Sequence, residues 1–283
     1  MLNKNIETFI GCDKEYSESD IVIFGAPFDS TTSFRPGARF ASRAMRSESF
    51  GIETYSPYCD RDLCDISVFD GGDLELPFGN PQKALDMIEK FSSAVISDGK
   101  LPLMIGGEHL VTLGAVRAAA KKYDNLCVIH FDAHADLRDE YLGESLSHAT
   151  VIRRVWDIVG DGRIYQFGIR SGDRSEFAWA KGRVHMQKFG FDRLEQITKN
   201  LWGRPVYLTV DLDVLDPSAF PGTGTPEAGG VLFDNLLYAI RQVCTLDIVG
   251  CDICELAPIY DSSGISTALA CKVLRELLLS LKI

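Results

Sequence analysis

Short apolar segments alternate along the chain with longer segments in which apolar residues recur every three or four positions. The first kind predicts buried strands, and the second predicts helices with one apolar face. The predicted strands are residues 21–25, 101–105, 126–131, 163–169, 206–210 and 247–254, and the predicted helices are residues 81–96, 112–123, 149–159, 191–201, 233–243 and 265–281. This alternation indicates an α/β fold, a three-layer α/β/α sandwich with a mainly parallel central sheet. No repeat or linker divides the sequence, so residues 1–283 are expected to form a single domain.

Four of the predicted strands end in charged or imidazole side chains. These are Glu108 and His109 after strand 101–105, Asp132, His134 and Asp136 after strand 126–131, Asp211 and Asp213 after strand 206–210, and Glu255 after strand 247–254. Open α/β sheets bind their ligands at the carboxyl ends of the strands. We therefore expect these residues to form one functional site.

The residue types in this group are those of a metal cluster. In an extended chain, side chains at positions i, i+2 and i+4 share a face, so Asp132, His134 and Asp136 are expected to point at one place, as are Asp211 and Asp213. A buried carboxylate is costly unless it is paired or coordinates a metal. The candidate ligands are four carboxylates and two imidazoles: His109, Asp132, His134, Asp136, Asp211 and Asp213. This mixture suits manganese better than structural zinc, and its size indicates two ions rather than one.

The remaining histidines and the cysteines have simpler interpretations. His130 is expected to point away from the cluster and pack, and His185 is expected to be structural. Taken alone, His109 also fits a turn histidine. Cys251 and Cys254 form a C-x-x-C motif, which occurs in redox and zinc sites, but the motif is single and lies in an apolar run. We therefore expect two buried thiols.

The composition narrows the partners and the compartment. The hydrophobic content of 46% and the charged content of 24% are normal for a globular protein. The formal net charge of −11 argues against nucleic acid or an anionic membrane as a partner and favours a cationic substrate. No apolar stretch reaches the ~20 residues of a membrane span, and the first residues lack the apolar core of a signal peptide. We expect a cytoplasmic protein whose eight cysteines are thiols.

Three segments resemble the signature segments of the ureohydrolase (arginase/agmatinase) family: Gly106-Gly107-Glu108-His109, Asp132-Ala133-His134-Ala135-Asp136 and the sequence TVDLDVLDP at 209–217. The resemblance extends over nearly the whole chain and is closest to agmatinases, through residues 25–29, 35–39, 137–141, 147–150, 221–230 and 255–258. Leu110 departs from the pattern, because many relatives carry Ser after the histidine. Leu110 matches no ligand position, so the expected metal site is unaffected.

The resemblance implies an arginase-like fold and a site with two Mn²⁺ ions per chain. One ion would be held by His109, Asp132, Asp136 and Asp211, and the other by His134, Asp132, Asp211 and Asp213, so that Asp132 and Asp211 bridge. The same resemblance implies that His148 shuttles protons and that Glu255 pairs with a substrate guanidinium, and Asp136 is counted with them as catalytic. Relatives commonly form trimers or hexamers, so a homo-oligomer is expected.

The choice among guanidine substrates rests on the loop between Asp136 and His148. This loop carries Asp139, Glu140 and Glu144 against one base, Arg138. An acidic loop disfavours a substrate carboxylate and tolerates a second cationic end, which indicates agmatine, with Asp139 as a substrate contact; the acids also fit a merely solvated loop. The expected reaction is agmatine + water → putrescine + urea. The alternatives are a guanidinobutyrase or an arginase of the same family, or a non-catalytic metal-binding protein. A dinuclear phosphoesterase is disfavoured because no Gly-Asn-His segment is present.

Overall fold

An eight-stranded sheet forms the centre of the protein in a computed structural model that describes residues 7–282. In spatial order the strands are β4 (Val68–Asp73), β1 (Ile21–Ala26), β5 (Leu101–Gly106), β10 (Asp247–Cys254), β9 (Pro205–Asp211), β6 (Cys127–Phe131), β7 (Ile164–Ile169) and β8 (His185–Lys188). Every neighbouring pair in this sheet is parallel. The predicted parallel sheet is therefore confirmed.

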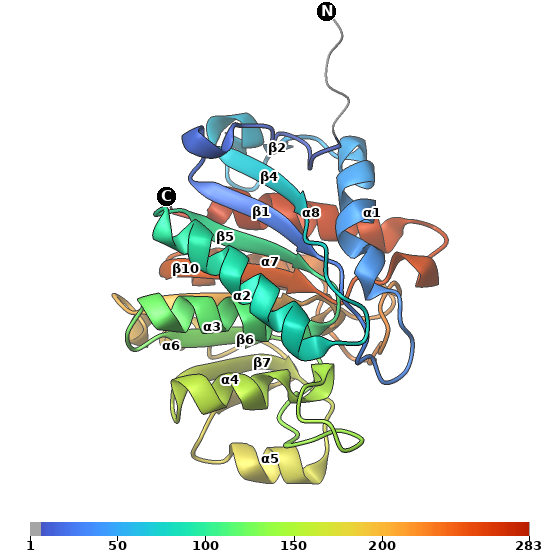
Figure 1. Ribbon diagram of the computed structural model, residues 1–283, viewed down its shortest axis with the longest axis vertical. Helices are drawn as coiled ribbons and strands as arrows, with labels where there is room; N and C mark the ends of the chain where they lie inside the picture. The colour runs from blue at the N-terminus through green and yellow to red at the C-terminus, as the bar shows by residue number, and fades with distance from the viewer. Residues whose placement is uncertain (1–6, 283) are drawn as a thin grey trace, which may run out of the picture.

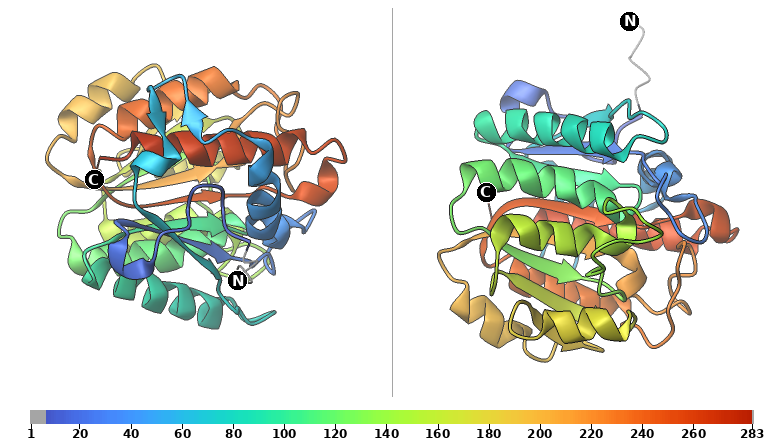
Figure 2. Two further views of the ribbon diagram at one scale, coloured as in Figure 1. Left: turned by 90° about the horizontal axis from the view of Figure 1, so that it is seen from above. Right: turned by 60° about the horizontal axis from the view of Figure 1, so that its bottom comes forward.

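Helices cover both faces of the sheet (Figures 1 and 2). One face carries α2 (Pro81–Ser97), α3 (Thr112–Lys122), α4 (Val151–Val159) and α5 (Arg174–Ala180), and the other carries α1 (Ala41–Glu48), α6 (Leu194–Asn200), α7 (Phe233–Val243) and α8 (Ile265–Ser280). Strand side chains alternate between the two cores: Ile129 and Phe131 pack with α6 and α7, whereas Val128 packs with α3 and α4. The two cores confirm the three-layer sandwich.

The elements that sequence patterning missed lie mainly at the edges of the sheet. The edge strands β4 and β8, the helices α1 and α5, and a two-stranded ribbon of β2 (Tyr55–Ser56) and β3 (Arg61–Asp62) were not predicted. Strand β8 has no fully buried residue, so it lacks the apolar run of a central strand. The helix expected at 149–159 begins only at Val151, because His148–Thr150 forms a 3₁₀ turn.

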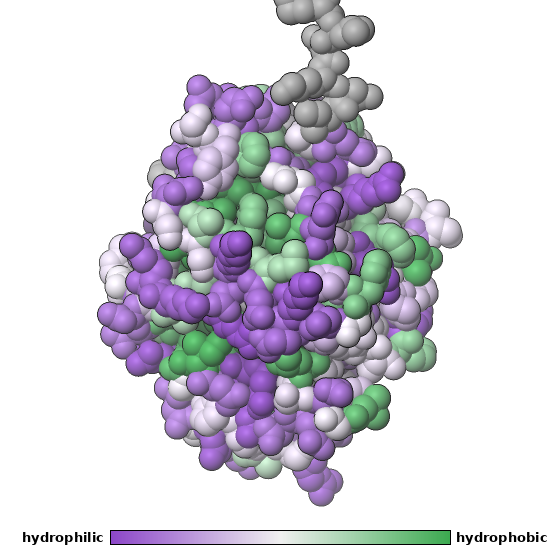
Figure 3. Space-filling model, in the orientation of Figure 1, coloured by the Kyte–Doolittle hydropathy of each residue, from purple (hydrophilic) through white to green (hydrophobic). Residues whose placement is uncertain are grey.

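The outer surface adds no sign of a membrane segment. None of the helices within residues 7–282 combines the length and the apolar character needed to cross a bilayer. On the face that carries α2 and α3, hydrophilic residues are spread widely, with hydrophobic residues in areas between them (Figure 3).

The strand order places the polar strand ends next to one another. Strands β5, β10, β9 and β6 are neighbours in the sheet, and they are the four strands that deliver the predicted site residues. The chain after β1 closes over the end of β5, where the Gly107 backbone N–H donates to Ala26 O at 2.9 Å and the Glu108 N–H donates to Phe28 O at 2.8 Å. This approach requires glycine at position 107, since a Cβ there would lie 1.9 Å from Phe28 O.

Gly107→Ala is expected to lower the free energy of unfolding by about 3 kcal/mol or more, the upper end of the usual cost of overpacking, because the obstacle is backbone that cannot rotate away. Calorimetry would measure the effect as a lower Tm. Gly51→Ala is the control, since its added Cβ meets no atom within 4 Å. Equal Tm values for the two variants would contradict the packing argument.

Candidate metal centre

The structure brings all six predicted metal ligands together at the carboxyl edge of the sheet. His109 is at the centre of one group: its Nδ1 lies 3.1 Å from Asp136 Oδ2, 3.2 Å from Asp132 Oδ2 and 3.4 Å from Asp211 Oδ2. His109 begins the turn after β5, Asp132 follows β6, and Asp211 is the last residue of β9. Three strands thus supply one cluster of oxygen and nitrogen atoms.

A second group shares one carboxylate with the first. His134 Nδ1 lies 2.9 Å from Asp213 Oδ2 and 3.5 Å from Asp132 Oδ1. Asp132 therefore turns one oxygen toward His109 and the other toward His134. The possible ligand atoms of Asp132, His134 and Asp213 lie within 4.8 Å of one another, as do those of His109, His130, Asp132 and Asp136, close enough to surround an ion. The geometry can accommodate two ions that share a carboxylate.

The local conformation differs from the extended one that the sequence suggested. Strand β6 ends at Phe131, and Asp136 has a φ of 53°, in the left-handed region. Asp213 lies in the 3₁₀ turn Leu212–Val214, and its N–H donates to Asp211 Oδ1 at 2.8 Å. Turns rather than alternating strand positions therefore direct these side chains. A left-handed backbone conformation is costly for any residue other than glycine. Such residues cluster at functional sites.

Negative charge accumulates in this cluster. The carboxylates of Asp132, Asp136, Asp211 and Asp213 belong to residues no more than 7% exposed, and within residues 7–282 no lysine or arginine forms an ion pair with them. Burial and the neighbouring Asp213 and Asp132 raise the pKa of Asp211 well above its usual value, and burial and Asp132 raise the pKa of Asp136 to about 7. Asp213 Oδ2 is buried and accepts no well-aligned hydrogen bond, although His134 Nδ1 lies 2.9 Å away. These donors fit divalent cations, which would relieve the repulsion.

His130 does not point away from the cluster, as the sequence had suggested. Its Nε2 lies 2.7 Å from Asp132 Oδ2, while the Gln166 amide nitrogen lies 3.0 Å from its Nδ1. An amide nitrogen can only donate, so His130 Nδ1 accepts and Nε2–H donates to Asp132. The signal was present in the sequence, because positions i and i+2 of an extended chain, here 130 and 132, share a face.

Two further residues orient His109 and were missed. His109 Nε2 lies 2.9 Å from Thr209 Oγ1, and the Thr209 hydroxyl donates to Asp252 Oδ1 at 2.7 Å. Because that hydroxyl has one hydrogen, it accepts from His109 Nε2–H, so the ring presents its other nitrogen, Nδ1, to the carboxylates. The sequence does mark these two residues, because Thr209 and Asp252 are polar positions inside the otherwise apolar strands β9 and β10. Such hydrogen bonds fix the tautomer and direction of a metal-binding histidine.

A cavity of about 370 Å³ opens beside the cluster. His134, Asp136 and His148 line it on the cluster side. The Ser33 backbone N–H donates to His148 Nε2 at 3.2 Å, and the Ser33 hydroxyl lies 3.0 Å from the same atom. Burial and the nearby His134 and His109 lower the pKa of His148 to about 4. His148 is thus a neutral imidazole at the cavity wall.

Glu255 directly follows β10, is buried, and does not line the cavity. Its Oε1 accepts from the His109 backbone N–H at 2.7 Å, and its φ of 67° is left-handed. Burial and the neighbouring Glu108 raise the pKa of Glu255 well above its usual value. The carboxyl group is therefore buried, oriented and without a basic partner in the described chain.

The structure does not place Asp139 at the cavity. Its carboxylate pairs with Arg154 at 2.8 Å and Arg153 at 3.6 Å, and its side chain is 74% exposed. The base of the loop, Arg138, lines the cavity instead and pairs with Asp173 at 2.7 Å. Two arginines of α4 hold the Asp139 carboxylate outside the cavity. This position argues against the expected contact between Asp139 and the substrate.

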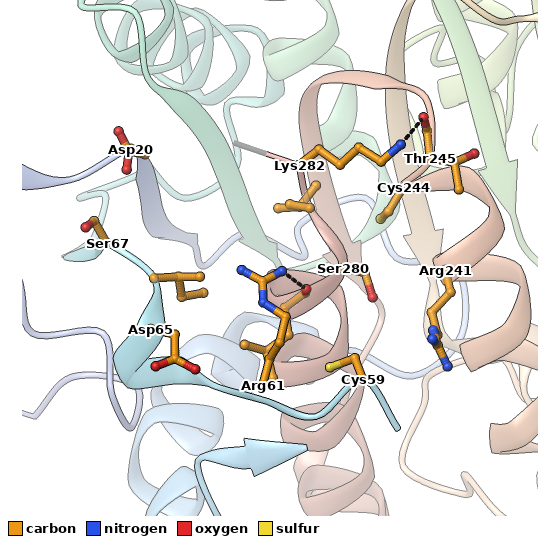
Figure 4. Close-up of a pocket in the computed structure, with 13 residues that line it drawn as sticks. Asp20, Cys59, Arg61, Asp65, Ser67, Arg241, Cys244, Thr245, Ser280 and Lys282 are labelled. Carbon is orange, nitrogen blue, oxygen red and sulfur yellow. Dashed lines mark hydrogen bonds between the residues drawn. The ribbon is translucent and has the colours of Figure 1, made fainter. Parts of the chain in front are cut away.

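A larger cavity, of about 560 Å³, lies at the opposite edge of the sheet (Figure 4). Asp20, Ser67 and Thr245 line it, and they directly precede or lie near the starts of β1, β4 and β10. It contains none of the six predicted ligands. The chemistry expected from the sequence is therefore confined to the smaller cavity.

The structural interpretations of the other residues hold. His185 stacks on Tyr165 with ring centroids 4.6 Å apart, as expected of a structural histidine. Cys251 and Cys254 are buried free thiols, so the C-x-x-C motif forms no disulfide.

Comparisons with known proteins agree with this geometry. The sequence model described as "Arginase family" matches residues 19–280. An agmatinase of Bacillus anthracis is 49% identical over 278 residues, which cover 96% of each chain, and a guanidinobutyrase of Pseudomonas aeruginosa is 35% identical, covering 93% of this chain and 87% of the relative. The crystal structure of a putative agmatinase from Clostridium difficile is 52% identical, with a TM-score of 0.92, covering 94% of this chain and 98% of the other. The chain belongs to the arginase family.

Proposed function

We propose that this protein is a ureohydrolase that uses two Mn²⁺ ions to hydrolyse agmatine to putrescine and urea. The observation that carries the proposal is the pair of His/Asp groups joined by Asp132 beside a cavity. The relatives named agmatinase, at 47–49% identity over 96% of the chain, support the substrate. Buried carboxylates that pair with no lysine or arginine within residues 7–282 are suited to binding cations.

Each ion would have ligands of both types. The proposed first site consists of His109, Asp132, Asp136 and Asp211, and the second of His134, Asp132, Asp211 and Asp213. Carboxylate-rich sites with some imidazole suit manganese. When bound, two such ions lower the pKa of a coordinated water and supply a nucleophile at neutral pH.

His148 is the proposed proton carrier. Its Nε2 accepts from the Ser33 N–H and therefore carries no proton, so the ring is a neutral base when substrate arrives. The departing amine must gain a proton, and His148 can take up the proton that the attacking water releases and pass it to that amine.

Glu255 is the proposed partner of the guanidinium group, which would have to enter past the present cavity wall to reach this buried carboxylate. A guanidinium presents a planar fork that matches a carboxylate, and the bond from the His109 N–H already holds Glu255 in one orientation. Pairing with a cation would also relieve the repulsion between Glu255 and Glu108, which raises the pKa of Glu255.

The far end of the cavity favours a substrate with a second cation. Asp173 and Glu176 line this wall with one base, Arg138, so the wall carries more negative than positive charge. The agmatine assignment therefore rests on this acidic wall and no longer on the loop that carries Asp139. Arg138 keeps a guanidino acid as the second candidate, since an arginine released from Asp173 could bind a carboxylate.

Two further expectations complete the proposal. The protein is cytoplasmic, in keeping with a small charged substrate. It forms a homo-oligomer, a trimer or a hexamer, and the exposed side chains of Phe34, Phe78 and Ile259 supply apolar surface of the kind that subunit contacts bury.

Manganese is expected to bind at about two ions per chain and to raise Tm, because a ligand that binds only the folded state stabilises it by about 2.7 kcal/mol at 100 times its Kd. Asp132→Asn should abolish most of this rise, since Asp132 faces both groups. Asp98→Asn, which removes one exposed carboxylate far from the cluster, should retain it. Elemental analysis and thermal melts measure both effects; an unchanged metal content in Asp132→Asn would exclude its bridging role.

Urea release from a panel of agmatine, arginine and 4-guanidinobutyrate after manganese loading tests the substrate. Agmatine should exceed arginine in kcat/KM by about 100-fold or more, since like-charge placement costs several kcal/mol and each ~1.4 kcal/mol is tenfold. Arginine turnover as fast as that of agmatine would refute the agmatinase assignment while leaving the ureohydrolase assignment in place. A preference for 4-guanidinobutyrate would favour the guanidino-acid alternative, in which Arg138 binds the substrate carboxylate.

Glu255→Gln keeps the shape of the side chain and removes its charge. We expect kcat/KM for agmatine to fall about 100-fold or more, because a charge-assisted bidentate pair is lost, while two manganese ions remain bound. Asp261→Asn, an exchange at a carboxylate that bonds to Ser263 and Ser266 and to none of the predicted metal ligands, is the control for activity. A Glu255→Gln enzyme with normal kcat/KM would rule out the guanidinium pair.

A further inference from the structure

We infer that Glu108 is a positioning residue that holds His148 in place through the hydroxyl group of Thr31. Glu108 directly precedes His109 at the end of β5, and its carboxylate turns toward the loop that follows β1. Thr31 belongs to that loop and contacts both Glu108 and His148. The inference rests on the proposed function of His148 as the proton carrier.

The Glu108 carboxylate is fully buried, and this loop supplies its hydrogen-bond donors. Its Oε2 accepts from the Thr31 backbone N–H at 2.9 Å and from the Thr32 hydroxyl at 3.1 Å, and its Oε1 accepts from the Thr31 hydroxyl at 2.5 Å. No lysine or arginine of the described chain pairs with it. A buried carboxylate without its hydrogen bonds is costly, so the loop and the carboxylate hold each other.

Counting hydrogens fixes the direction of the chain of bonds. The His148 backbone N–H lies 3.0 Å from Thr31 Oγ1, and a backbone N–H can only donate. Thr31 Oγ1 therefore accepts from His148, and its single hydrogen goes to Glu108. Glu108, Thr31 and His148 form an ordered series in which each bond constrains the next.

The same loop also holds the imidazole ring. Ser33, two residues after Thr31, donates its N–H to His148 Nε2 at 3.2 Å. Farther along, Arg35 donates to Gly224 O at 3.0 Å and Thr223 O at 2.7 Å, which fixes the end of the loop. His148 is thus held at its backbone by Thr31 and at its ring by Ser33, and both depend on the loop that Glu108 binds.

Loss of the Glu108 carboxylate should therefore disturb proton transfer more than metal or substrate binding. His109 keeps its own support from Thr209, so the cluster does not depend on the loop. Displacement of a catalytic group by about 1 Å can cost 100-fold in rate. We expect a lower kcat with a nearly unchanged KM and metal content.

The test is a double-mutant cycle measured as urea release from agmatine by manganese-loaded enzyme. Glu108→Gln should lower kcat by about 10- to 100-fold in the wild-type background and by less than about twofold in the His148→Ala background, because the residue acts through His148. An equal loss in both backgrounds would overturn the inference. If His148→Ala alone retains the wild-type kcat, the proposed function of His148 fails instead.

A second set of variants avoids the buried carboxylate, whose exchange could impair folding. Thr31→Val removes the linking hydroxyl and should reproduce the loss of kcat, whereas Thr31→Ser should retain kcat within about threefold of wild type, since it keeps the hydroxyl. Thr32→Val is the matched control: its hydroxyl also contacts Glu108, but not His148. Similar kcat values for Thr31→Val and Thr32→Val would refute the link through Thr31, and metal content measured in each variant separates loss of ions from loss of geometry.

Discussion

Six carboxyl groups lie at one edge of the sheet with almost no access to water, and the surrounding structure must compensate their charge. They belong to Glu108, Asp132, Asp136, Asp211, Asp213 and Glu255, none more than 7% exposed. Within residues 7–282 only histidines form ion pairs with them. Hydrogen bonds from backbone N–H groups and hydroxyls supply part of the compensation, and divalent cations are suited to supply the rest. The edge is costly to the folded protein until a cation occupies it.

The neighbours of the cluster follow from this constraint. A cation would bind His109 through Nδ1, and the Thr209–Asp252 pair holds the other ring nitrogen, Nε2, as a donor. Gln166 donates to Nδ1 of His130, so the proton of His130 lies on Nε2 and points at Asp132. These partners are fully buried polar groups inside the apolar layers. Their positions are explained by the charge they orient, and not by packing.

The sequence predicts the centre of this protein better than its edges. Strands β5, β6, β9 and β10 are buried on both faces and end in charged residues, so apolar runs reveal both the strand and the site. Strand β8 is half-exposed, and no apolar run marks it. The direction of the His130 side chain was predicted wrongly. Strand periodicity puts positions 130 and 132 on the same face, and His130 does contact Asp132. The pairing of Asp139 with Arg153 and Arg154 depends on how α4 packs beside the loop, which no local pattern encodes.

The strand order has a consequence for synthesis. Strand β10 is the last strand along the chain, yet it lies in the middle of the sheet between β5 and β9. Until it emerges from the ribosome, β4-β1-β5 and β9-β6-β7-β8 can exist only as two separate sheets, each with an open inner edge. Unpaired apolar edges are sites of aggregation, and long-range pairing of this kind is slow. The nascent chain therefore has a late interval in which the other seven strands of the eight-stranded sheet have been made and the two edges that flank β10 remain available to a chaperone or to another chain.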